Sequence, residues 1–290
     1  MTYSDNRRSG GNFSMRTPYG YTPGYKANDG RAEFMVPIHT VRQLLSSALV
    51  AAGAICFSLY IILYLAGVFT GETSSFINTL LSSEDYFISY SPFVIMIISA
   101  VCVIPDIILA IGVWLIYSAA AKRSIRSIKT TGLTIIKVIT IIKFVICMIL
   151  FAAMLIIFGF VAVIIFTGSQ GIISADTEIS KAAAVIFLAV TALLCAVFVI
   201  YYVMLIKSLT TIKRTVSSGR PSAKVSVYVA VISFLFAVCF AASVVAFLRL
   251  DNIFMAVSGG LHAVSFILFG VFLLVYRSRL RSMTDGMIFY

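Results

Sequence analysis

The sequence predicts an all-α integral membrane protein with six transmembrane helices. Its composition, its apolar segments and the distribution of its charges all indicate this. Of the 290 residues, 61% are hydrophobic and only 11% are charged, whereas a soluble domain is about half apolar and a quarter charged. The mean hydropathy is +1.06. A chain of this composition has hydrocarbon, not water, as its main solvent.

A hydrocarbon core about 30 Å thick requires roughly twenty apolar residues in a helix. Six segments meet this requirement: residues 44–69, 93–119, 134–166, 182–206, 225–248 and 254–276. We expect them to form one bundle over residues 44–276, arranged as three helical hairpins. A polar N-terminal tail (1–43) precedes the bundle, and a basic C-terminal tail (277–290) follows it.

The basic residues are distributed unevenly among the connections. Twenty of the 22 lysines and arginines lie in the two tails or near the even-numbered connections, and Lys181 and Arg249 are the exceptions. Because basic loops stay in the cytoplasm, this bias predicts that both termini are cytoplasmic. The expected location is the plasma membrane or a bacterial inner membrane.

The net charge of +11 therefore indicates topology and attraction to anionic headgroups. No folded basic domain is predicted that could bind nucleic acid, so we expect the lipid bilayer to be the partner of these charges. The residues expected to contact anionic lipid are Lys122, Arg123, Arg126, Lys129, Lys213 and Arg214.

The N-terminal tail is rich in Gly, Tyr, Pro, Ser and Asn and has no apolar periodicity. Such a composition cannot bury enough surface to offset the loss of chain entropy on ordering. We predict a disordered cytoplasmic tail. The alternative is a docking segment for a membrane or cytoplasmic protein partner.

The third predicted span is longer than a bilayer requires, and its first part contains Lys137 and Lys143 among isoleucines. We interpret this part as an interfacial turn whose lysines reach back to the headgroups. The alternative is that the two lysines line a pore.

Asp106 follows Pro105 near the middle of the second span, where an ionised carboxylate costs about 2.5–3.5 kcal/mol to insert. Ser99 and Cys102 lie on the same helical face, which we expect to point into the bundle. Pro105 removes a backbone donor and predicts a helix kink. Asp106 either donates, as a neutral acid, to the carbonyl that the kink frees, or forms a proton-relay or cation site.

The sixth span contains Ser258, His262 and Ser265 on one stripe, beside small residues. By depth along its helix, His262 is the expected partner of Asp106, through a water molecule. Lys143 is placed too close to the inner edge to reach it. The alternative is that this stripe serves only to pack helices together.

No enzyme motif is found, neither a zinc-protease helix nor a nucleophile elbow nor a phosphate-binding loop. The five cysteines fall one in each of the first five spans, without the spacing of metal ligands. We therefore expect a protein that is not an enzyme and has no metal and no cofactor.

Two functions are compatible with these features. The first is transport of a small solute or ion, or the membrane subunit of a transporter, which predicts that Asp106 and His262 face a common polar interior. The second is a non-transporting scaffold or sensor, whose basic loops and tail bind lipids or partner proteins and whose interior is dry and tightly packed. The cost of a mid-membrane acid favours the first.

Overall fold

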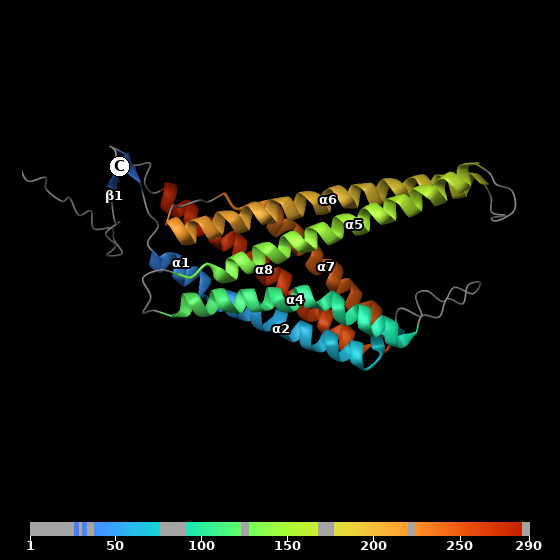
Figure 1. The fold of residues 1–290 in the computed structure, drawn as a ribbon, viewed down its shortest axis with the longest axis horizontal. Coiled ribbons are helices and arrows are strands. Elements are labelled where there is room, and N and C mark those ends of the chain that lie inside the picture. Colours follow the sequence, from blue (N-terminus) through green and yellow to red (C-terminus); the bar gives the residue numbers. More distant parts are fainter. Residues whose placement is uncertain are drawn as a thin grey trace, which may run out of the picture.

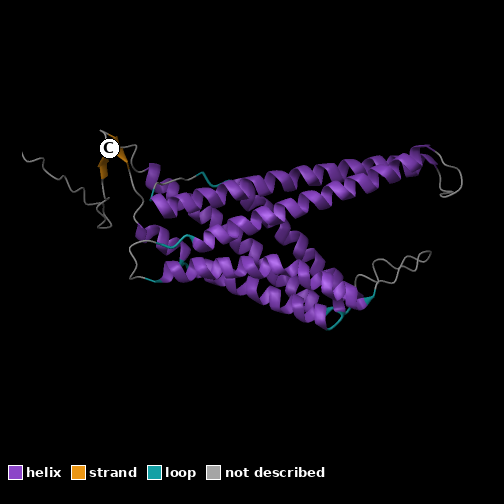
Figure 2. Cartoon of the chain, in the orientation of Figure 1, coloured by secondary structure: helices purple, strands orange, loops and turns teal. Residues whose placement is uncertain are grey.

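The computed structural model describes residues 26–28, 31–33, 38–75, 91–122, 128–167, 177–219 and 224–285. They form a helical bundle with a small hairpin of strands near its N-terminal end (Figures 1 and 2). The helices are α1 (Ile38–Leu45), α2 (Ala48–Phe69), α4 (Pro92–Ala121), α5 (Thr131–Thr167), α6 (Thr177–Ser218), α7 (Val227–Arg249) and α8 (Ile253–Asp285). Six segments of the described chain are long and apolar enough to cross a membrane, and α1 and α2 together form the first of them. The protein is therefore a multi-pass membrane protein.

Several helices extend beyond the spans predicted from apolarity. Helix α6 continues past Lys207 to Ser218, because backbone hydrogen bonding does not stop at the first charged side chain. It ends where Gly219 adopts a φ of 69° and its N–H donates to the Thr215 carbonyl at 3.0 Å. Glycine at a left-handed position is a common helix stop.

The first span differs from its predicted form because it is divided into two helices. Ser47 has extended backbone angles and its hydroxyl accepts a hydrogen bond from the N–H of Val50 at 3.4 Å, which caps the start of α2. Serine is a favoured residue at this position. Helix α1 begins at Ile38, inside the segment predicted as a tail.

Two short strands also lie within the segment predicted as a tail. Strands β1 (Lys26–Asn28) and β2 (Arg31–Glu33) pair antiparallel, with Lys26 opposite Glu33. Asp29 and Gly30 separate them in the sequence, a dipeptide that favours tight hairpins. The average composition of a tail of about forty residues does not reveal this two-residue turn signal. The rest of the predicted tail lies outside the described residues.

The spanning helices form a ring in chain order. Each packs against its neighbour in sequence, and α8 closes the ring against α2. The contacts of α8 with α7 and α2 are the most extensive, whereas α6 and α7 touch over a shorter length. Because successive helices run in opposite directions, α1 begins and α8 ends at the same end of the bundle (Figure 1).

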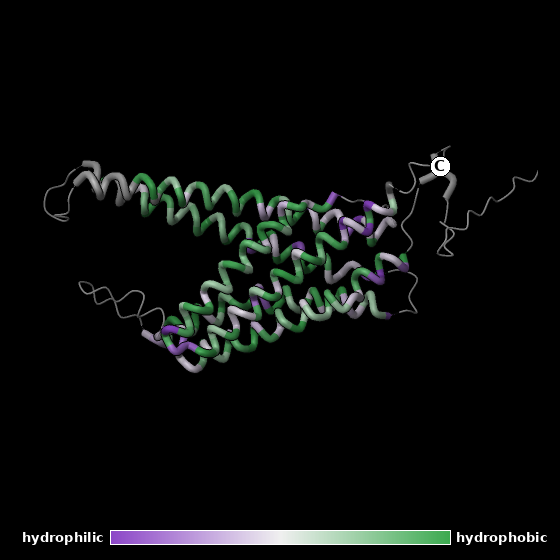
Figure 3. The backbone as a smooth tube through the Cα atoms, turned by 180° about the vertical axis from the view of Figure 1, so that it is seen from behind, coloured by the Kyte–Doolittle hydropathy of each residue, from purple (hydrophilic) through white to green (hydrophobic). Residues whose placement is uncertain are grey.

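The two ends of the bundle differ in charge. We call one the basic end, because α4 ends at it beside Lys122 and α6 ends at it with Lys213 and Arg214. At the opposite, acidic end lie Glu72 and Asp251. Figure 3 shows hydrophilic residues near the helix ends and hydrophobic residues along most of the helix lengths between them.

The bundle is packed most densely toward the basic end. Its main buried cluster joins residues of α1, α4, α5, α6, α7 and α8, and includes Leu45, Ile116, Ile212 and Tyr276. Toward the acidic end, α5 and α6 run side by side and diverge from α2 and α4 (Figure 1). Many of their apolar side chains, such as Ile156, are exposed in the protein alone, as expected for surfaces covered by lipid.

The backbones of α4 and α5 touch near the basic end at a pair of glycines. A Cβ atom added to Gly132 would lie 2.5 Å from the Gly112 carbonyl oxygen and 2.8 Å from the Ile116 nitrogen. Only glycine permits this approach, which is a common way for membrane helices to associate. This contact positions the start of α5 against α4.

At the acidic end, Glu72 links the end of α2 to the start of α8. Its carboxylate accepts hydrogen bonds from the backbone N–H groups of Phe254 at 3.3 Å and Met255 at 3.1 Å. These N–H groups lack partners within their own helix, and a negative charge there also interacts favourably with the helix dipole. The turn after α2 is thereby attached to the helix that contains His262.

We predict that Gly132→Ala lowers the melting temperature of the purified protein in detergent, because its methyl group would separate α4 from α5. Gly159→Ala on the same helix is the matched control, since a Cβ at Gly159 meets nothing within 4 Å. In an open helical position this exchange stabilises by up to about 1 kcal/mol. Equal melting temperatures for the two variants would show that the close contact does not support the fold.

Candidate functional site

Asp106 lies midway along α4 and points into the bundle, with only 8% of its surface exposed. Ser99, Val103 and Ala110 are buried on the same helical face. One oxygen of the Asp106 carboxylate forms an ion pair with the Nζ atom of Lys143 on α5. The center of this membrane-spanning bundle therefore contains two opposite charges in direct contact.

The prediction that Lys143 lies too near the inner edge to reach Asp106 was wrong. Helix α5 begins at Thr131, and Gly132 is level with Gly112 and Ile116 of α4. Eleven residues of helix raise Lys143 by about 16 Å, and Asp106 lies about 9 Å above Gly112. The remaining 7 Å or so is spanned by the lysine side chain, because helical side chains lean toward the start of their own helix.

Tyr60 on α2 provides a second partner for the carboxylate. Its hydroxyl donates to the second oxygen of Asp106 at 3.4 Å, and its side chain is buried. Tyr60 is not among the site residues predicted from the sequence. A signal was present, since a tyrosine at the middle of a span must find a partner for its hydroxyl.

His262 lies within a stack of aromatic rings. The centre of its ring is 3.9 Å from that of Tyr60 and 4.3 Å from that of Phe240, and the Phe266 ring, one turn further along the same face of α8, lies 5.0 Å away. We call Tyr60, His262 and Phe240 the ring stack. The expected pairing of His262 with Asp106 is not found, because Lys143 occupies the carboxylate and His262 is connected to it only through Tyr60.

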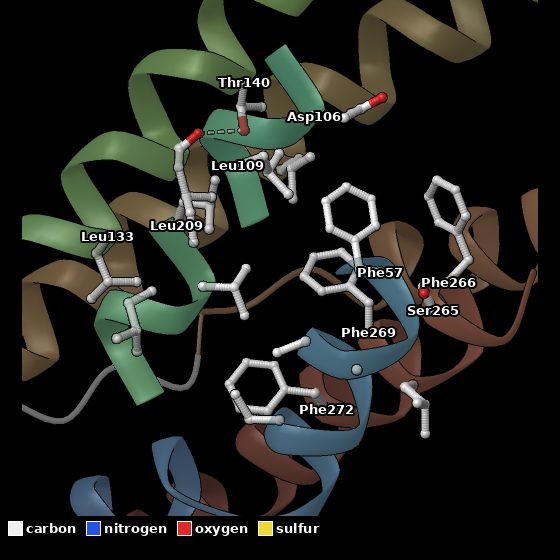
Figure 4. A pocket seen from close by; sticks show the side chains of 18 of the residues that line it. Phe57, Asp106, Leu109, Leu133, Thr140, Leu209, Ser265, Phe266, Phe269 and Phe272 are labelled. Atoms are coloured by element: carbon white, nitrogen blue, oxygen red, sulfur yellow. Dashed lines mark hydrogen bonds between the residues drawn. The ribbon is translucent and has the colours of Figure 1, made fainter. Parts of the chain in front are cut away.

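A central cavity of about 270 Å³ lies beside the ion pair. All six spanning helices contribute to its lining, including Asp106, Lys143 and His262. Most of the other lining residues are apolar. Figure 4 shows Phe57, Phe266, Phe269 and Phe272 gathered on one side of this cavity, facing Leu109, Leu133 and Leu209 on the other.

A second cavity of about 290 Å³ lies between α2, α7 and α8 on the acidic side of His262. Tyr60, Phe240 and His262 all line it, together with Ser258 and Gly259. His262 also lines the central cavity. The ring stack therefore stands between the two cavities.

The other intramembrane residues singled out by sequence are distributed over this region. Ser265 lines the central cavity and Ser258 the second one, and their hydroxyls donate to carbonyls of their own helix at 2.9 Å. Ser99 is buried within reach of the Tyr64 hydroxyl but lines neither cavity. Pro105 lies inside α4, which continues as one helix past it.

The basic residues expected at the lipid surface lie apart from this site. Lys122, Lys129 and Arg214 are exposed and Lys213 is half-buried, all at the basic end. Arg123 and Arg126 lie outside the described residues. Of the four described residues, none lines either cavity.

No group of three or more potential metal ligands occurs among the described residues, and the five cysteines are free. The site instead brings together a carboxylate, an ammonium group, an imidazole and tyrosine hydroxyls at mid-membrane depth. Such groups can hold a charged solute or pass a proton between them. Comparison of the chain with protein-family models, curated proteins and solved structures finds no match in any of the three.

We predict that Asp106→Asn and Lys143→Gln each lower the free energy of unfolding by about 3–5 kcal/mol, because each leaves a buried charge without its partner. The double variant Asp106→Asn/Lys143→Gln contains no unpaired charge and should recover at least half of the summed loss. The stability of the single and double variants is compared by thermal unfolding, which size-exclusion chromatography monitors. Lys137→Gln is the control on the same helix. Additive losses in the double variant would mean that the two side chains do not interact.

Proposed function

We propose that the protein transports a small solute or ion through the central cavity, alone or as the membrane subunit of a larger transporter. The observation that supports this most is the Asp106–Lys143 ion pair, which lines a cavity to which all six spanning helices contribute. A charged pair inside a membrane is expensive to maintain, and such groups usually belong to a solute or proton pathway.

The central cavity also helps to distinguish transport from the alternative function. A scaffold or sensor without transport activity predicts a dry, tightly packed interior around Asp106. A hollow of about 270 Å³ beside the ion pair favours the transport proposal instead.

The ring stack is the closed barrier of the proposed route. It separates the central cavity from the second cavity, and its rings are held by stacking, which is worth about 0.5–1.5 kcal/mol per pair beyond the area that it buries. Tyr60 belongs to the stack and also donates to Asp106. A change at the ion pair is therefore transmitted to the barrier by one hydrogen bond.

In the proposed topology the basic end faces the cytoplasm, with both termini on that side of the plasma membrane or bacterial inner membrane. Lysines and arginines near the basic end support this orientation by the positive-inside rule. Lys143 no longer belongs to that group, since it lies in the interior. In this orientation Lys122, Lys129, Lys213 and Arg214 contact anionic headgroups.

We predict that Asp106→Asn reduces proton flux by about tenfold or more in liposomes that contain the purified protein. An internal pH-sensitive dye follows the decay of an imposed pH gradient, with empty liposomes as the baseline. Loss of the carboxylate removes the acceptor at mid-membrane depth. Asp251→Asn at the acidic end is the matched control, because Asp251 has a φ of 55° that asparagine tolerates. Equal flux through both variants, or no flux through the wild type, would favour the scaffold function.

We predict that His262→Ala opens the barrier. In a variant that lacks the five native cysteines, a cysteine at Ser265 should react slowly with a charged thiol reagent that approaches from the acidic end. Removal of the imidazole should accelerate this reaction by about tenfold or more, because the central cavity then joins the second one. A cysteine at Ser258, in the second cavity, should react rapidly in both backgrounds.

Phe198→Ala is the control for the barrier experiment. Phe198 also stacks on another ring, that of Phe236, at 5.3 Å, but it lines neither cavity. It should leave the reactivity at Ser265 unchanged. If His262→Ala changes the reactivity no more than Phe198→Ala does, the ring stack is not the barrier.

A further inference from the structure

The hydrogen-bonding groups around the central cavity indicate the chemistry of its solute. We infer that the cavity binds a small amphipathic acid, whose carboxylate contacts Lys143 and whose apolar body lies among the phenylalanine rings. This inference rests on the proposed function, since it names the class of solute for the same cavity.

Each oxygen of the Asp106 carboxylate already has a partner. One oxygen of Asp106 contacts Lys143, and the other accepts the Tyr60 hydroxyl at 3.4 Å. Its side chain is 12% exposed. A positively charged solute would therefore have to displace the Lys143 ammonium group from Asp106, and that group is tethered to the same protein.

The ammonium group, in contrast, has free capacity. A lysine offers three N–H donors, and Asp106 is the single ionic partner of Lys143 among the described residues. The Lys143 side chain is 30% exposed, more than twice the exposure of Asp106. The open side of the ion pair is thus its positive side, which suits an acceptor such as a carboxylate.

Two further donors line the same cavity. In the described part of the chain, no hydrogen bond involves the Tyr202 hydroxyl or the His262 ring nitrogens, and both residues contribute to the cavity lining. The hydroxyl protons of Thr140 and Ser265 are used within their own helices, at 2.7 Å and 2.9 Å. Besides the Lys143 ammonium group, the Tyr202 hydroxyl and one nitrogen of the His262 ring can therefore donate to a solute.

The remainder of the lining sets the character of the solute body. Phe57, Phe266, Phe269 and Phe272 form one wall (Figure 4), and Phe236 adds a ring from α7. A volume of about 270 Å³ is slightly below the usual range of small-molecule sites, about 300–1,000 Å³. A compact apolar or aromatic body with one acidic group fits these walls.

The experiment compares three probes that share one body: 3-phenylpropionate, 3-phenylpropylamine and 3-phenylpropanol. Binding to the purified protein in detergent is measured by calorimetry, with the wild type and single variants. We expect the acid to bind about tenfold tighter than the amine or the alcohol, because only the acid provides a charged acceptor for Lys143.

The variants assign the contact. Lys143→Gln should weaken binding of the acid by about tenfold or more, whereas Lys143→Arg should retain it. Asp106→Asn should keep or strengthen it, since the ammonium group is then released. Lys137→Gln is the control on the same helix, because Lys137 does not line the cavity. If Lys143→Gln does not fold, the neutral double variant Asp106→Asn/Lys143→Gln replaces it and should also lose binding.

Two results would overturn the inference. One is preferred binding of the amine that is lost in Asp106→Asn and kept in Lys143→Gln, which would assign the cavity to a cation. The other is no binding of the acid at millimolar concentration. Binding of the acid without flux of it into liposomes would leave the site intact and contradict transport instead, so the two proposals fail separately.

Discussion

The ion pair between Asp106 and Lys143 is the constraint on which the interior of this protein depends. Neither charge is stable alone at this depth, because hydrocarbon offers no solvation. Their contact requires α4 and α5 to hold a fixed register, which the Gly112–Gly132 approach provides. It also requires Tyr60 to satisfy the remaining oxygen. The packing of three helices is thus specified by one carboxylate.

The ring stack extends this constraint to α7 and α8. Tyr60 contacts Asp106 on one side and the imidazole of His262 on the other. His262 in turn meets Phe240 of α7, and Glu72 attaches the start of its helix to the end of α2. The charged site and the barrier between the two cavities are therefore parts of one connected structure.

The six spans could be predicted from the sequence because hydrocarbon thickness imposes a length and an apolarity on every helix. Helix ends were harder, since α6 and α8 continue through charged residues outside that thickness. The pairing of Lys143 could not be read from apolarity. The end of an apolar segment does not give the depth of Lys143 in the membrane, because the register of α5 depends on a glycine contact between two different segments. Tyr60 was missed because one aromatic residue in an apolar span is common.

The close approach of Gly112 and Gly132 at the basic end gives α5 the geometry of a lever. Its fulcrum lies at the dense end of the bundle, and its free arm reaches the region where the α5–α6 hairpin leaves the other helices (Figure 1). Lys143 is about 16 Å along that arm, so a tilt of about 10° displaces it by roughly 3 Å. That displacement is enough to break an ion pair. A small rocking of the α5–α6 hairpin would thereby make or break the ion pair and so change the electrostatic potential in the central cavity.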